Sequence, residues 1–365
     1  MLPKKVRRGT DMAKMTTQER VKRMYEHRDA DRVPVMDSPW KETIERWMSE
    51  GMPTEDYIAH FDLDRTAYIS TDNSPQLPET IVSEDDAYII RTTKWGATTR
   101  TYKKLTTTPE HLGFSVTTPD AWAKVKERMV PSDDRIPWAW LKKNYKNWRE
   151  EGRWITGGLW FGFDISHSYM LGTETMLMAM LEEPEWVADM FNHELDVSLA
   201  MLERIWDAGY TVDEVHWYDD MGYKQSQFFS MRVYRELLKP AHQRAIDWAH
   251  AHGCVARLHS CGDVMPYVPE LVSMGLDGLN PLEVKAGMKP TELKKEFGDK
   301  LLFHGGINAV NWDKPDVITA EIERVVPIMK ENGGYIFASD HSIPPHVSYQ
   351  DFANIINTVK RVGSY

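Results

Sequence analysis

A histidine and a cysteine two residues apart, His259 and Cys261, are the pair in this sequence best suited to hold a metal. Imidazole nitrogen and thiolate sulfur are preferred ligands of zinc. The pair follows an apolar, β-prone run that begins at Val255, so we expect both side chains at the C-terminal end of a strand, directed to the same side. A packed core histidine beside a buried cysteine is the alternative interpretation of this motif.

A catalytic zinc site usually has three protein ligands and one open position, so a third ligand should come from another strand end. The candidates are His341, Asp340 and Glu283, and His341 ranks first because a second imidazole keeps the site soft. Without a metal, His341 would instead be an acid–base or binding residue.

Two adjacent carboxylates, Asp219 and Asp220, follow another expected strand and are candidate catalytic residues. Either one could act as a general base, bind the substrate, or orient a ligating histidine. A helix cap followed by a turn at Gly222 is the alternative. Tyr169 lies on the loop after a third strand, where it could donate a hydrogen bond to a substrate or pack in the core.

Short β-like segments alternate with stretches of helical length along the chain, and their number predicts a single TIM (β/α)8 barrel. A doubly wound open sheet is the alternative. The expected strands are 31–36, 67–70, 154–159, 214–218, 255–259, 278–280, 301–304 and 335–338. In a barrel, the polar residues at their ends would meet at one mouth, where we expect substrate to contact Asp37, Trp40, Asp72, Trp217, Glu283 and Asn308.

Residues 77–107 interrupt this alternation with β-branched and aromatic runs separated by turns, which predicts an antiparallel β meander inserted in the barrel. Residues 1–15 are basic, lack the apolar segment of a secretory signal, and are expected to be a disordered extension. The chain contains no linker rich in proline, glycine or serine, so residues 16–365 are expected to form one domain.

The composition narrows the classes of partner. A formal charge of −11 and a pI near 5.7 argue against nucleic acid, and no apolar run is long enough to cross a membrane. Two cysteines are too few for a disulfide framework, which favours a reducing cytoplasm. The glycine pairs lack the spacing of phosphate-binding loops, so no nucleotide cofactor is indicated. A homodimer is compatible with the sequence, which does not fix the oligomeric state.

Several motifs together resemble the uroporphyrinogen decarboxylase superfamily, over roughly residues 16–362. They are Arg32–Val35, Arg257–Val264, Asp277–Glu283, Phe303–Asn308 and Gly334–Pro345. The resemblance implies a TIM barrel and two chemistries. In the metal-free decarboxylases, Tyr169 and His341 would match a functional tyrosine and a late histidine. The arginine-rich N-terminal motif of those enzymes is missing here, and residues 34–40 stand in its place.

The second branch, the cobalamin-dependent methyltransferases, carries a zinc-binding His-x-Cys that His259 and Cys261 resemble. The later cysteine of its thiol-methylating members would fall at His341. The resemblance therefore implies a zinc-dependent methyltransferase that moves a methyl group from a small donor to a corrinoid protein. The abundant tryptophans suggest a methoxylated aromatic donor. The alternatives are a metal-free decarboxylase of a carboxylated substrate and a non-catalytic module that docks a corrinoid protein.

Overall fold

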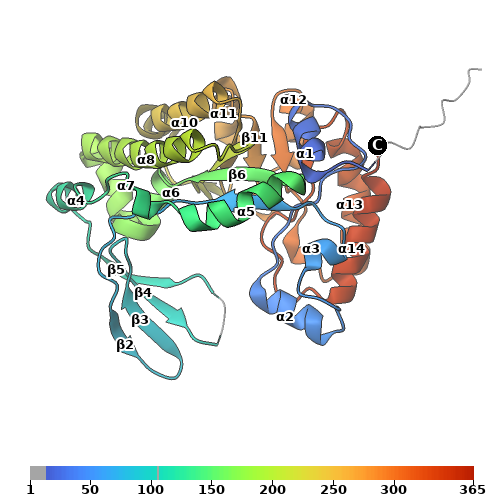
Figure 1. The fold of residues 1–365 in the computed structure, drawn as a ribbon, viewed down its shortest axis with the longest axis horizontal. Coiled ribbons are helices and arrows are strands. Elements are labelled where there is room, and N and C mark those ends of the chain that lie inside the picture. Colours follow the sequence, from blue (N-terminus) through green and yellow to red (C-terminus); the bar gives the residue numbers. More distant parts are fainter. Residues whose placement is uncertain (1–13, 105–106) are drawn as a thin grey trace, which may run out of the picture.

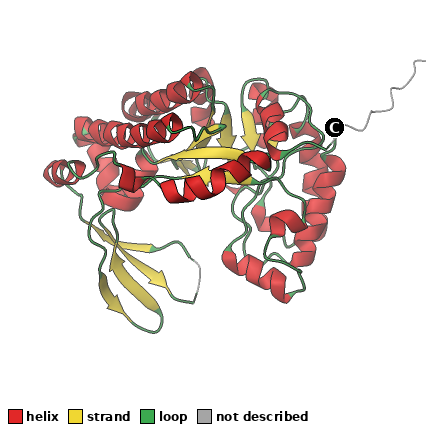
Figure 2. Ribbon diagram, in the orientation of Figure 1, coloured by secondary structure: helices red, strands yellow, loops and turns green. Residues whose placement is uncertain are grey.

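A curled, parallel, seven-stranded sheet forms the centre of the computed structural model, which describes residues 14–104 and 107–365, with helices around the outside (Figures 1 and 2). The strands pair in the order β1-β6-β7-β10-β11-β12-β13. Their bounds are β1 (Thr66–Ile69), β6 (Trp154–Leu159), β7 (Glu214–Tyr218), β10 (Val255–His259), β11 (Gly278–Asn280), β12 (Leu302–His304) and β13 (Tyr335–Ile336). These seven lie where the sequence predicted them, and the curled α/β architecture is consistent with a TIM-like barrel.

The eighth predicted strand, 31–36, is an extended segment rather than a regular strand. Val35 forms a single parallel bridge with Phe337, whose N–H donates to the Pro34 carbonyl at 2.8 Å. On its other side, the Val35 carbonyl accepts a hydrogen bond from the Asp64 N–H at 3.2 Å, just before β1. The segment therefore lies between the two ends of the sheet. Pro34 explains part of its irregularity, because proline has no N–H to donate.

Helices follow most of the strands and cover the outside of the sheet (Figure 2). They are α1 (Thr17–Tyr25), α2 (Lys41–Ser49), α3 (Tyr57–His60), α4 (Pro119–Lys126), α5 (Trp138–Glu150), α6 (Phe163–Ser166), α7 (Thr173–Glu182), α8 (Pro184–Asp207), α9 (Met231–Val233), α10 (Lys239–Ala251), α11 (Val268–Ser273), α12 (Pro290–Phe297), α13 (Pro315–Met329) and α14 (Tyr349–Val362). The long helical stretch after β6 is divided into α7 and α8, because Pro184 starts the second helix. Pro240 lies in the first turn of α10, directly after a π-helical turn, η3 (Tyr234–Leu238).

A separate antiparallel sheet has the order β2-β3-β4-β5 and projects from the body at the lower left of Figure 1. Its strands are β2 (Ile81–Glu84), β3 (Tyr88–Thr92), β4 (Ala97–Tyr102) and β5 (Glu110–Phe114). The predicted meander, 77–107, stops short of β5, the last strand of this sheet. The Glu110–Phe114 segment alternates poorly, and Gly113 weakens its strand character.

The buried interior matches a sheet covered on both faces, since every residue of β6 is buried. Residues 1–13 of the predicted extension lie outside the described residues. At its end, the Met15 N–H donates to Asp31 Oδ2 at 2.9 Å. No helix within residues 14–104 and 107–365 is long and apolar enough to cross a membrane.

Candidate active site

Asp220, His259 and Cys261, called the triad below, gather at the C-terminal ends of β7 and β10. Among the described residues, a ligand atom from each lies within 4.8 Å of the others. His259 Nε2 is 3.3 Å from Cys261 Sγ and 3.7 Å from Asp220 Oδ1. Because β7 and β10 are hydrogen-bonded neighbours, with His259 beside Tyr218, the strand register brings the three side chains together.

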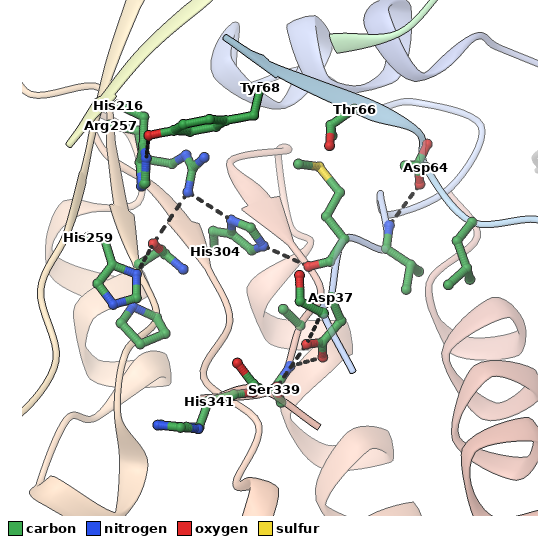
Figure 3. Close-up of a pocket in the computed structure, with 18 of the residues that line it drawn as sticks. Asp37, Asp64, Thr66, Tyr68, His216, Arg257, His259, His304, Ser339 and His341 are labelled. Atoms are coloured by element: carbon green, nitrogen blue, oxygen red, sulfur yellow. Dashed lines mark hydrogen bonds between the residues drawn. The ribbon is translucent and has the colours of Figure 1, made fainter. Parts of the chain in front are cut away.

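His341, the third ligand favoured from the sequence, is not part of this group. It lies beyond β13, three strands away from β10 in the sheet order, and its side chain is exposed at the cavity edge. The structure brings Asp220 to the pair instead, because the neighbouring strand β7 ends beside β10. His341 still lines the same cavity, where Figure 3 shows it below His259.

Neighbouring strand ends hold the loop that carries His259 and Cys261. Three consecutive backbone N–H groups of this loop, those of residues 260 to 262, each donate a hydrogen bond to a residue at or just after the end of another strand. The bonds are Ser260 N to the Asn280 carbonyl at 2.8 Å, Cys261 N to Asp220 Oδ1 at 2.7 Å, and Gly262 N to Glu283 Oε2 at 2.7 Å. Such anchoring fixes the loop before any ligand binds.

Gly262 makes the turn of this loop possible. Its φ of +82° lies in the left-handed region, and a Cβ there would approach the carbonyl carbon of Gly222 to 2.1 Å. Since that neighbour is backbone, it has little freedom to move away. The close approach of these two glycines is what allows the loops after β7 and β10 to pack together.

The hydrogen-bond partners of His259 define which ring nitrogen is free. Arg257 Nη1, which can only donate, lies 3.3 Å from Asn280 Oδ1, and His259 Nδ1 lies 2.9 Å from the same oxygen. Nδ1 therefore carries the proton, and Nε2 presents its lone pair toward Cys261. Burial, followed by the charge of Arg257, lowers the pKa of His259 to about 4, so the ring is neutral at neutral pH.

Negative charge is in excess around the thiol. Burial, then the carboxylates of Asp220, Glu283 and Asp164, raise the pKa of Cys261 above its ordinary value. Burial and Asp164 also raise the pKa of Asp220, to about 7. A divalent cation would reverse both shifts by neutralising the carboxylates and stabilising the thiolate. The donor set of imidazole, thiol and carboxylate thus fits zinc.

The triad opens into a cavity of about 510 Å³ with a mixed aromatic and polar lining. Figure 3 labels ten of the lining residues, among them Asp37, Tyr68, His259 and His341. Its polar and aromatic members include Asp37, Tyr57, Tyr68, His216, Tyr218, Arg257, Asn280, His304, Ser339 and His341. A cavity of this size at the ends of parallel strands suits a small organic ligand.

Asp37 is the member of the predicted substrate-binding set that lines the cavity. Its carboxylate accepts the Ser339 N–H at 2.6 Å and the Ser339 hydroxyl at 3.0 Å. Burial raises its pKa to about 6 despite these bonds. Asp37 can therefore exchange a proton near neutral pH.

Asp219 and Trp217 do not reach the cavity. Asp219 is fully buried, its Oδ2 lies 2.8 Å from His242 Nε2, and its Oδ1 accepts the Asp164 N–H at 2.8 Å. Trp217 is also fully buried and packs against Phe161 and His242. Successive residues on a strand face opposite sides, so 217 and 219 point outward toward the helices while 216 and 218 point inward.

Three other predicted substrate contacts also lie outside the cavity lining. Asp72 pairs with Lys94 at 3.0 Å near the meander, and Asn308 caps a short turn, 309–311. Trp40 is the residue that precedes α2. Each follows a strand-like segment, but the loops carry the side chains away from the centre.

Glu283 and Tyr169 lie near the triad without lining the cavity. The Glu283 carboxylate accepts a hydrogen bond from the Gly262 N–H. Tyr169 belongs to a π-helical turn, η2 (His167–Leu171), and its ring centroid is 5.8 Å from that of Trp95 in the meander. Its half-buried ring joins the body to the inserted sheet.

Apart from His259, the residues on the inward faces of β7 and β10 were not among the predicted site residues. Glu214, His216 and Tyr218 alternate along β7, and Arg257 and His259 alternate along β10. Polar residues at a period of two are unusual in a parallel strand buried on both faces, and this pattern was the available indication of a polar interior.

Together, the curled parallel sheet and the ligand-type triad at its C-terminal edge define an α/β protein with a TIM-like site. The sequence profile of uroporphyrinogen decarboxylase (URO-D) matches residues 165–362, and the chain belongs to this family.

Two known proteins show how far the similarity extends. A uroporphyrinogen decarboxylase from Vesicomyosocius okutanii subsp. Calyptogena okutanii is 27% identical over 94 residues, and the match spans about a quarter (26%) of that relative and of this chain. A methyltransferase from Methanosarcina mazei has the same fold, with a TM-score of 0.63 and 17% identity over 95% of this chain and 99% of that one.

Proposed function

We propose that this chain is a zinc-dependent methyltransferase that moves a methyl group from a small donor to a corrinoid protein. The observation that carries the proposal is the triad, in which His259 Nε2, Cys261 Sγ and an Asp220 oxygen lie within 4.8 Å of one another. Membership of the URO-D family and the fold shared with the Methanosarcina mazei methyltransferase support it.

The triad residues would hold the zinc and leave one position open to the cavity. Bound zinc supplies Lewis-acid activation of the heteroatom that bears the methyl group. Asp220 has a second task, because its Oδ1 also anchors the Cys261 N–H. The neutral His259 ring binds a cation without first losing a proton.

The cavity walls would position the donor. Tyr57, Tyr68 and Tyr218 line it, and flat aromatic side chains favour a flat ligand such as a methoxylated aromatic. Asp37, which lines the same cavity, would hold or release the proton that the demethylated oxygen requires. The corrinoid, carried by a partner protein, would receive the methyl group at the mouth formed by the strand ends.

The test is methyl transfer from methoxylated aromatics to a reduced corrinoid, followed by the absorption change of the methylated cobalt. Cys261→Ala should abolish transfer. Cys254→Ala is the matched control, because Cys254 is buried with its thiol donating to the Val212 carbonyl at 3.2 Å, away from the triad. Equal activity in wild type and Cys261→Ala would contradict the proposal.

A metal-free decarboxylase is the second candidate, favoured by the family match and the curated relative. It predicts release of carbon dioxide from a carboxylated substrate by protein that contains no zinc.

A non-catalytic docking module is the remaining alternative. Such a module would need no polar cavity, and it predicts binding of a corrinoid protein without any methyl transfer.

A further inference from the structure

We propose that Asn280 is a positioning residue that holds His259 in the tautomer with a free Nε2. The inference deepens the proposed function and rests on it for the role of zinc. Asn280 ends β11, directly beside His259 in the parallel register, so their side chains lie on the same face of the sheet.

The orientation of the Asn280 amide follows from two of its neighbours, Arg257 and His259. Its Oδ1 lies 3.3 Å from Arg257 Nη1 and 2.9 Å from His259 Nδ1. A guanidinium can only donate, so the amide oxygen, and not the amide nitrogen, must face it. The same oxygen then requires a donor at His259 Nδ1. The proton on Nδ1 leaves the Nε2 lone pair directed at Cys261, the neighbouring member of the triad.

Arg257 is itself fixed. Its Nε and Nη2 both donate hydrogen bonds to Glu214 Oε1, at 3.0 Å and 2.6 Å. The Arg257 and Glu214 side chains are almost fully buried. Glu214 Oε2 in turn accepts the Tyr25 hydroxyl at 2.8 Å and the Trp154 indole N–H at 3.1 Å. A chain of contacts therefore runs from the sheet interior through Arg257 and Asn280 to His259.

The main chain of Asn280 has a separate task that substitution would leave intact. Its carbonyl accepts the Ser260 N–H at 2.8 Å and so anchors the loop independently of the amide. Replacing the Asn280 side chain thus removes the acceptor for His259 Nδ1 but keeps the backbone hydrogen bond from Ser260. Partners that orient a metal-bound histidine in this way typically contribute tenfold to hundredfold in metal affinity.

The test compares Asn280→Leu, which removes the acceptor, with Asn280→Asp, which keeps an oxygen facing Nδ1. Zinc affinity is measured by competition with a chromophoric chelator. We expect about a 10- to 100-fold weaker Kd in Asn280→Leu and a wild-type or tighter Kd in Asn280→Asp. Equal zinc affinity in all three proteins, or equal loss in both variants, would overturn the proposal.

A second readout separates this inference from the proposed function. Nitrogen-15 NMR of the metal-free proteins reports which ring nitrogen of His259 is protonated. We expect Nδ1–H alone in wild type and Asn280→Asp, and a mixture of tautomers in Asn280→Leu. If wild type binds no zinc, the proposed function fails, yet the NMR comparison still decides the role of Asn280. An unchanged tautomer in Asn280→Leu would refute it.

Discussion

Replacing Arg257 with methionine should destabilise the protein severely, because it leaves the Glu214 carboxylate buried without its cation. The two side chains are 8% and 1% exposed, and they meet at 2.6 Å. Breaking a buried ion pair by removing one partner costs about 3–5 kcal/mol. The unfolding entropy of a 365-residue chain is about 0.8 kcal/mol/K, so a loss of about 4 kcal/mol lowers Tm by about 5 °C.

Scanning calorimetry of the metal-free protein measures this shift, with Glu214→Gln/Arg257→Met as the matched control. The double variant removes the orphaned charge while Gln can still accept hydrogen bonds from Tyr25 and Trp154. It should therefore be more stable than Arg257→Met alone. A Tm within about 1 °C of wild type for Arg257→Met, or a double variant less stable than the single, would refute the reasoning.

Two further predictions concern Asp37 and Gly262. Burial raises the pKa of Asp37 from 3.8 to about 6, so the folded chain binds the Asp37 proton more tightly than the unfolded chain does. The resulting stabilisation of the folded state is fully present below pH 3.8 and is lost as pH rises through about 6. Urea unfolding should show wild type losing stability relative to Asp37→Asn over that interval, and a constant difference would contradict the shift. Gly262→Ala should cost more than about 1 kcal/mol and weaken zinc binding, since its Cβ would meet Gly222 backbone; unchanged urea midpoint and zinc affinity would refute this.

Much of the fold could be predicted from the sequence because the strands are short segments rich in β-branched, aromatic and other apolar residues, with clear ends. The 154–159 and 214–218 segments have the bounds that their patterns indicated. The segment near Val35 was harder to predict, because a single bridge to Phe337 depends on a contact between the two ends of the chain.

The site could be predicted only in part, since residues at strand ends are visible in the sequence but strand order is not. His259 and Cys261 stand together in the chain, whereas Asp220 joins them through the pairing of β7 with β10. His341 is the better ligand by chemistry alone, but the order of the sheet places it at another part of the cavity lining, outside the triad. Asn280 was invisible for the same reason, because its role comes from the register of β11 against β10.

Zinc content of the purified protein tests the central claim most directly, measured by elemental analysis beside His259→Ala, Cys261→Ala and the Cys254→Ala control. The triad predicts about one zinc per chain in wild type and in Cys254→Ala, and its loss in the other two variants. Protein prepared without chelators, exposed to zinc and still free of the metal would contradict the zinc mechanism and favour the metal-free decarboxylase.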